Sequence, residues 1–164
     1  MLDSEGLPEN LRAVMSGEPL GKVFPVSPEE IGEISRIGNL YAQQAQWERA
    51  ANVFNGLIAL APNHYLGHAG MGDLLLRQKK VKEAFAPLLK AATINSNDPY
   101  VCTNLGEVLM RLNKIKEAMT LLQSVTEMDP QQRHPACNRA RALLEALRER
   151  MQSAAPAEGA APKS

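Results

Sequence analysis

Apolar side chains in this chain recur at intervals of three and four residues, and the whole pattern returns every 34 residues between Ile31 and Gln132. The interval is clearest at Gly38, Gly72 and Gly106, each of which is followed twelve places later by an alanine. A spacing of three and four places side chains on one stripe of a helix. Each repeat has two such stripes, so each repeat predicts a pair of amphipathic helices.

The glycines and alanines are expected where two helix axes cross, because a larger side chain there would force the backbones apart. A single helix pair cannot bury its own apolar stripes, so the three pairs are expected to stack. Ser27, Pro28 and Glu30 form a strong helix start, with a capping box around the first turn. The predicted helices cover about residues 28–44, 47–60, 65–78, 81–94, 99–112 and 115–128.

The two ends of the chain add shorter elements. The predicted organisation is an N-terminal helix and apolar connector at 1–26, three repeats within 27–132 (31–64, 65–98 and 99–132), a C-terminal capping helix at 133–152 and a disordered tail at 153–164. The capping helix has an apolar stripe, and the charged residues expected on its solvated outer face are Arg139, Arg141, Arg148, Glu149 and Arg150.

The segment Leu7–Met15 predicts a helix too short to be stable alone. It is expected to dock on the repeats of its own chain or on a second copy, and the alternative is a tether frayed in solution. The connector that follows it, Glu18–Val26, is expected to pack back on the first repeat. The apolar residues predicted to mediate self-association are Leu11, Val14, Met15 and Phe24.

With these features the chain resembles the tetratricopeptide repeat family, whose 34-residue period and Gly, Ala, aromatic and Pro positions are matched by Gly38, Ala50, Phe54 and Pro62. The resemblance covers about 102 of the 164 residues. It implies an all-α fold: a right-handed superhelical solenoid of three helix pairs with a C-terminal capping helix. In that family, peptides bind a concave face lined by the first helix of each pair.

The family's contact positions are mainly the second, fifth, ninth, twelfth and thirteenth places of each repeat. Carried over to this sequence, the resemblance implies a candidate groove set of Ser35, Asn39, Ala42, Gln43, Leu66, Ala69, Asp73, Leu76, Arg77, Tyr100, Thr103, Glu107, Met110 and Arg111. Its mixture of small, apolar and amide side chains suits an extended segment that inserts apolar side chains into pockets. The alternative is that Leu66 and Leu76 pack neighbouring helices.

Some family members clamp the C-terminal carboxylate of heat-shock chaperones with lysines and arginines on the first helices. At those places this chain has Ser35, Gly70, Tyr100 and Asn104, so a carboxylate clamp is not expected.

The order of parts resembles, more narrowly, the class II chaperones of bacterial type III secretion systems. The stretches that carry this likeness are 16–20 with 27–30, 37–41, 47–54, and 98–100 with 105–109. The likeness implies a non-enzymatic cytosolic chaperone that holds an apolar segment of a secreted translocator-type protein in the concave groove. The alternative is a scaffold that assembles folded partners, or copies of itself, through its convex and N-terminal surfaces.

Composition narrows the classes of partner. The formal net charge is zero, so no excess of basic residues points to nucleic acid or to an anionic membrane. The N-terminus shows no basic segment followed by an apolar run, and no window is apolar enough to span a membrane, so a cytoplasmic protein is expected.

Catalytic chemistry finds little support in the sequence. His64, His68 and His134 have no metal-ligand spacing, and the glycines at the helix crossings form no phosphate-binding loop. Cys102 and Cys137 are interpreted as packed free thiols of a reducing compartment. The sequence therefore predicts no catalytic residue, no metal and no cofactor.

Overall fold

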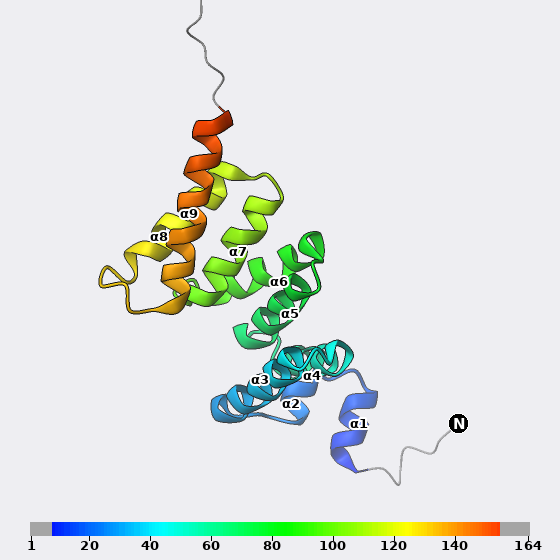
Figure 1. Cartoon of the computed structure of the whole chain (residues 1–164). Helices are drawn as coiled ribbons and strands as arrows, with labels where there is room; N and C mark the ends of the chain where they lie inside the picture. Colours follow the sequence, from blue (N-terminus) through cyan, green and yellow to red (C-terminus); the bar gives the residue numbers. More distant parts are fainter. Residues whose placement is uncertain (1–7, 155–164) are drawn as a thin grey trace, which may run out of the picture. The chain divides into compact units, whose positions relative to one another are not determined.

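The computed structural model describes residues 8–154, and within that range it contains helices and no strand (Figure 1). The helices are α1 (Glu9–Met15), α2 (Leu20–Val23), α3 (Pro28–Gln43), α4 (Trp47–Leu60), α5 (Tyr65–Arg77), α6 (Val81–Ile94), α7 (Pro99–Arg111), α8 (Ile115–Glu127) and α9 (Pro135–Ala154). The predicted all-α fold is confirmed, and the six repeat helices end within one residue of their predicted bounds. The chain divides into two compact units, Met1–Ser96 and Asn97–Ser164.

In the first unit, α3 pairs with α4 and α5 pairs with α6, while α5 also packs against both α3 and α4. The start of α3 has the capping box predicted from the sequence. The Glu30 backbone N–H donates to Ser27 Oγ over 3.2 Å, and the Ser27 N–H donates to Glu30 Oε2 over 2.7 Å. This second bond is the main reason that the pKa of the Glu30 carboxyl is lowered.

The core of each pair forms where a glycine of the first helix meets a large side chain of the second. A Cβ built at Gly38 would lie 2.6 Å from the Phe54 ring, and one built at Gly106 would lie 2.6 Å from Leu122 Cδ2. Gly72 meets Leu88 in the same way. Phe54, Leu88 and Leu122 are all fully buried, and so are Ala50, Ala84 and Ala118. The prediction that small residues mark the helix crossings is confirmed.

The turns inside the pairs also repeat. Ala45, Lys79 and Asn113 have positive φ values of 57°, 62° and 61°, and they stand 34 residues apart. After each one, a backbone N–H donates five residues back, as from Gln46 to the Tyr41 carbonyl over 2.9 Å. This bond satisfies a carbonyl that the helix end would leave without a partner. The repeat therefore extends to the backbone conformation of its turns.

The N-terminal elements belong to the first unit. The connector forms the short helix α2, and Gly21 lies so close to the Leu60 carbonyl at the end of α4 that a Cβ would overlap it. The expected packing of the connector on the first repeat is confirmed. Helix α1 contacts α2 and buries none of its side chains completely. Its predicted first residue, Leu7, lies outside the described residues.

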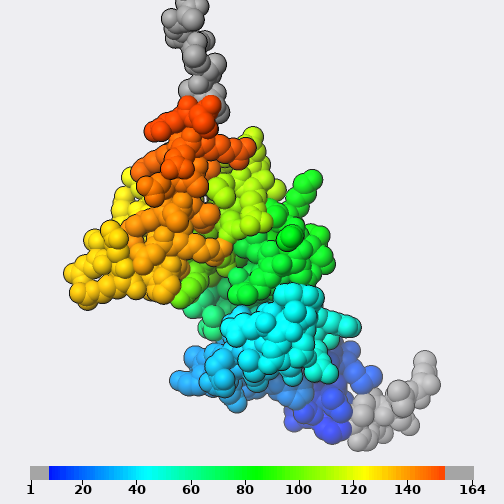
Figure 2. Space-filling model, viewed as in Figure 1, coloured from blue at the N-terminus to red at the C-terminus, as the bar shows by residue number. Residues whose placement is uncertain are grey.

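In the second unit, α9 packs against both α7 and α8. Figure 2 shows its orange side chains between the yellow-green of α7 and the yellow of α8 and the turn that follows. Helix α9 continues to Ala154, and the predicted tail beyond it, 155–164, lies outside the described residues. Among the described helices, none is both long and apolar enough to cross a membrane.

Two arginines of α9 make bonds to neighbouring helices that the sequence did not predict. Arg141 donates to the Thr126 carbonyl over 3.0 Å and also to the Asp129 carbonyl, so it binds carbonyls at and just beyond the C-terminal end of α8. Arg139 instead bonds to side chains of α7. Arg139 is exposed as predicted, and Arg141 is only partly exposed; both also pair with acceptors of neighbouring helices, because exposed carbonyls and a buried carboxylate bind cationic side chains well.

Candidate protein-binding site

The candidate groove set is only partly open to solvent. Asn39, Gln43, Arg77, Tyr100 and Arg111 are exposed, and Leu66, Ala69, Asp73 and Met110 are partly buried. The remaining members are buried: Ser35, Ala42, Leu76, Thr103 and Glu107. These five hold helices together and do not form an open surface. The alternative interpretation of Leu76 as a packing residue fits its 9% exposure, whereas Leu66 keeps a partly open side chain.

In the first unit, the open members come from α3 and α5, which pack against one another. Asn39 and Gln43 present amide groups on α3, and amides can pair with the backbone of an extended peptide. On α5, Arg77 Nε donates to Asp73 Oδ2 over 2.6 Å, so these two charges neutralise each other. This surface is polar, with small or partly covered apolar side chains between the amides and the ion pair.

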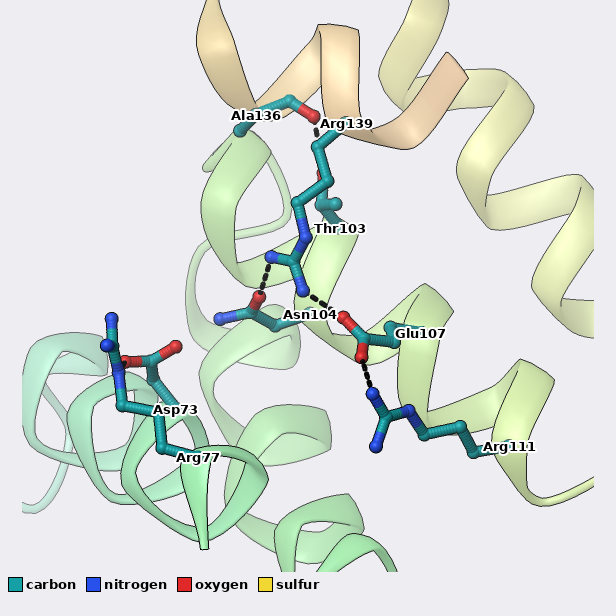
Figure 3. A network of polar contacts seen from close by, with 8 residues as sticks. All are labelled: Asp73, Arg77, Thr103, Asn104, Glu107, Arg111, Ala136 and Arg139. Atoms are coloured by element: carbon teal, nitrogen blue, oxygen red, sulfur yellow. Dashed lines mark hydrogen bonds and ion pairs between the residues drawn. The ribbon is translucent and has the colours of Figure 1, made fainter. Parts of the chain in front are cut away.

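In the second unit, the site is built around the buried carboxylate of Glu107 on α7 (Figure 3). Arg111, one turn further along α7, contacts Glu107 Oε1 over 2.5 Å. Arg139 reaches across from α9 and binds Glu107 Oε2 through Nη2, while its Nη1 donates to Asn104 Oδ1 over 2.7 Å. A buried carboxylate requires such partners, because removing it from water without them is costly.

A second contact joins the same helices near their N-terminal ends. The Thr103 hydroxyl, fully buried, donates to the Ala136 carbonyl over 3.1 Å. Next to this contact, Tyr100 is 54% exposed, and its ring meets the His134 ring edge-on at 5.1 Å between centroids. The side chains left open to solvent in this region are therefore those of Tyr100 and Arg111 on α7, of Arg139 on α9, and in part of Met110.

Sequence reasoning missed Arg139 and Asn104 as parts of this site. Arg139 was read as a solvated charge because its pattern position lies on the polar side of an amphipathic helix. The only signal in the sequence for such a partner was indirect: if Glu107 is buried, it needs a cation within reach. That requirement does not identify which helix supplies the second arginine.

Two histidines and both cysteines have structural roles. His64 Nδ1 accepts the Leu66 N–H and His134 Nδ1 accepts the Ala136 N–H, both over 3.3 Å, at the starts of α5 and α9. Burial is the main cause that raises the pKa of the Cys102 and Cys137 thiols, so both favour the protonated, unreactive form. Within residues 8–154, no group of three or more potential ligands could hold a metal ion.

The fold and the site together define a class of protein: an α-helical repeat protein built from tandem helix pairs, with polar and apolar side chains displayed by the first helix of each pair. Two family models, both described as tetratricopeptide repeat, match residues 35–99 and 75–144. Together they span 35–144, and the chain belongs to the tetratricopeptide repeat family. No curated protein matches the sequence.

Several solved structures share the fold. The type III secretion translocator chaperone SycD of Yersinia enterocolitica is 18% identical, with a TM-score of 0.68 over 77% of this chain and 89% of that chain. PcrH of Pseudomonas aeruginosa is 20% identical, with a TM-score of 0.64 over 75% and 95%. The first repeat domain of human RPAP3 is 19% identical, with a TM-score of 0.66 over 77% and 96%.

Proposed function

We propose that this chain is a non-enzymatic, cytosolic chaperone that binds an apolar segment of a secreted translocator-type protein on the first helices of its repeats. The observation that supports this proposal is that α7, which is buried from Val101 to Leu109, leaves Tyr100 in its first turn 54% exposed and Met110 near its C-terminal end partly exposed. Aromatic side chains of this kind are the usual anchors of protein interfaces. The amides of Asn39 and Gln43 supply backbone partners in the first unit.

Structures of similar proteins support the choice of partner. SycD has been crystallised with a peptide of the translocator YopD, and PcrH with the chaperone-binding region of PopD. A repeat domain of RPAP3 has been solved with an HSP90 peptide. The residues that clamp a peptide carboxylate in such domains are replaced here by Ser35, Gly70, Tyr100 and Asn104, so an apolar segment is the better-supported ligand.

A selection from a library of displayed short random peptides tests this function. Wild-type chain is expected to select sequences rich in apolar residues. Tyr100→Glu and Met110→Glu are expected to weaken the selected peptides by about tenfold or more, because a carboxylate would be buried against an apolar ligand. Isothermal titration measures the affinities, and circular dichroism checks that helix content is unchanged.

Leu89→Glu is the matched control for these variants. Leu89 is 45% exposed on α6, the second helix of its pair. The Leu89→Glu substitution should therefore leave peptide affinity unchanged. Leu76→Glu is unsuitable as a test because Leu76 is buried. Selection of no peptide at all, or equal affinity for wild type and both groove variants, would remove the basis of the chaperone proposal.

A second function, self-association, is favoured by the outer face of α3. The seventh and tenth places of the first repeat, Ile37 and Leu40, are 44% and 48% exposed. The equivalent of Leu40 in the second repeat is Leu74, which is 1% exposed and packs with Ala42, Ala50 and Phe54 of the preceding pair. Within residues 8–154 no helix pair precedes α3 and α4 to cover this face, and the apolar area suits a second copy.

The N-terminal residues predicted for self-association agree with this proposal. Leu11, Met15 and Phe24 are 44%, 64% and 39% exposed, and Val14 is partly buried. One solved form of SycD is described as an alternative dimer, so assembly of similar proteins has precedent.

We expect the wild-type chain to form a dimer that Ile37→Glu or Leu40→Glu converts into a monomer, because a buried carboxylate pair at the interface is strongly unfavourable. Light scattering coupled to size exclusion measures the mass over a range of concentrations. The Leu89→Glu variant should keep the wild-type mass. A wild-type monomer at high concentration, or dimers in all variants, would contradict the assignment of this face.

A further inference from the structure

Two of the ion-pair sites in residues 8–154 differ in their balance of charge. In the first unit, Arg77 and Asp73 form a single pair of opposite charges. In the second unit, Glu107 is shared by Arg111 and Arg139, so this site has two guanidinium groups for one carboxylate. The second site therefore has an excess positive charge that the first site lacks.

The excess charge faces solvent although the carboxylate does not. The Glu107 side chain is 10% exposed, whereas the side chains of Arg111 and Arg139 are 44% and 47% exposed. In the described part of the chain, the bonds found for the Arg111 guanidinium involve Nη2 alone, and those of Arg139 involve Nη1 and Nη2. A guanidinium carries five N–H donors, so each arginine has donors left for a ligand.

The two arginines are also held in place before a ligand arrives. Glu107 fixes one end of each guanidinium, and Asn104 fixes Arg139 further. Arginine loses less rotamer freedom on binding when its planar group is already oriented. Partly exposed, oriented guanidinium groups match carboxylates in geometry as well as in charge.

We propose that Arg111 and Arg139 form an anchor for an aspartate or glutamate side chain of the bound segment, whose apolar residues contact Tyr100 and Met110 elsewhere on α7. The inference rests on the proposed function and adds the chemistry of the partner: an apolar segment that contains an acidic residue. The anchor binds a side-chain carboxylate, and it uses an arginine of α9 that lies outside the repeats themselves.

The peptides selected by the wild-type chain test the anchor. They are expected to contain an aspartate or glutamate at a constant spacing from their apolar residues. Changing that residue to the corresponding amide should weaken binding about tenfold, since a charge-assisted bond is lost. Arg111→Gln should cause the same loss for the acidic peptide and no loss for the amide peptide, while Arg111→Lys should restore part of the affinity.

Arg77→Gln is the matched control, because Arg77 occupies the same place in the second repeat but pairs with its own aspartate. It should leave the preference for the acidic residue unchanged. Helix content of every variant is checked by circular dichroism. Selection of apolar peptides without an acidic residue, or an unchanged acidic preference in Arg111→Gln, overturns the anchor and leaves the chaperone proposal standing. Selection of no peptide overturns both.

Discussion

Replacing Phe54 with alanine is expected to lower the free energy of unfolding of the first unit by about 3–5 kcal/mol. The ring is fully buried and lies against Gly38 of its own pair and Gly70 of the next, whose missing side chains make room for it. Alanine would leave a cavity between three helices that cannot close, because the glycines contribute no side chains to fill it. Urea unfolding followed by circular dichroism measures the change.

Phe24→Ala is the control for this experiment. Phe24 is 39% exposed, so its truncation should cost only about 1–2 kcal/mol. A loss of similar size in both variants would mean that the Phe54 ring is not the core that joins α3, α4 and α5. Since small domains are stable by only about 5–15 kcal/mol, the Phe54→Ala variant is expected to be close to unfolding at physiological temperature.

Replacing Glu107 with alanine is expected to destabilise the second unit by about 2 kcal/mol. Removing one partner of a buried ion pair commonly costs more, about 3–5 kcal/mol. The arginines here are nearly half exposed, and water can solvate them after the change, which reduces the cost. The amides of α9 near Arg139 should exchange with solvent faster, because the bond between α7 and α9 through Glu107 is lost.

The control is Glu33→Ala, which removes the ion pair between Glu33 and Arg36. Both side chains of that pair are mostly exposed, at 64% and 71%, so the change should stay within about 0.5 kcal/mol. Equal effects of the two variants on urea unfolding would show that Glu107 contributes no more than a surface charge. Unchanged hydrogen exchange in α9 would lead to the same conclusion.

The fold could be predicted from the sequence because its signals are local and repeated. The glycine, alanine and apolar positions return three times at one interval. A departure from the pattern in one repeat is therefore outweighed by the match in the other two. The turn residues could not be predicted in the same way. Ala45 and Lys79 adopt positive φ without being glycine, because the flanking helices and the repeated backbone bonds impose that conformation.

The candidate site was harder to predict than the fold. A contact position within the repeat identifies the helix face, but exposure depends on which other helix covers that face. Thr103 and Glu107 lie at contact positions and are nevertheless buried, with bonds to Ala136 and Arg139 of α9. Such contacts join residues more than 30 positions apart, and no local pattern in the sequence encodes them.

Purification of the tagged chain from its own cell, with identification of bound protein by mass spectrometry, tests the central claim most directly. The account predicts one stoichiometric partner with long apolar segments, which is insoluble when expressed alone, becomes soluble on co-expression, and is lost from the Tyr100→Glu variant. Recovery of folded proteins that are soluble by themselves, or of further copies of this chain alone, would contradict the chaperone function and favour a scaffold.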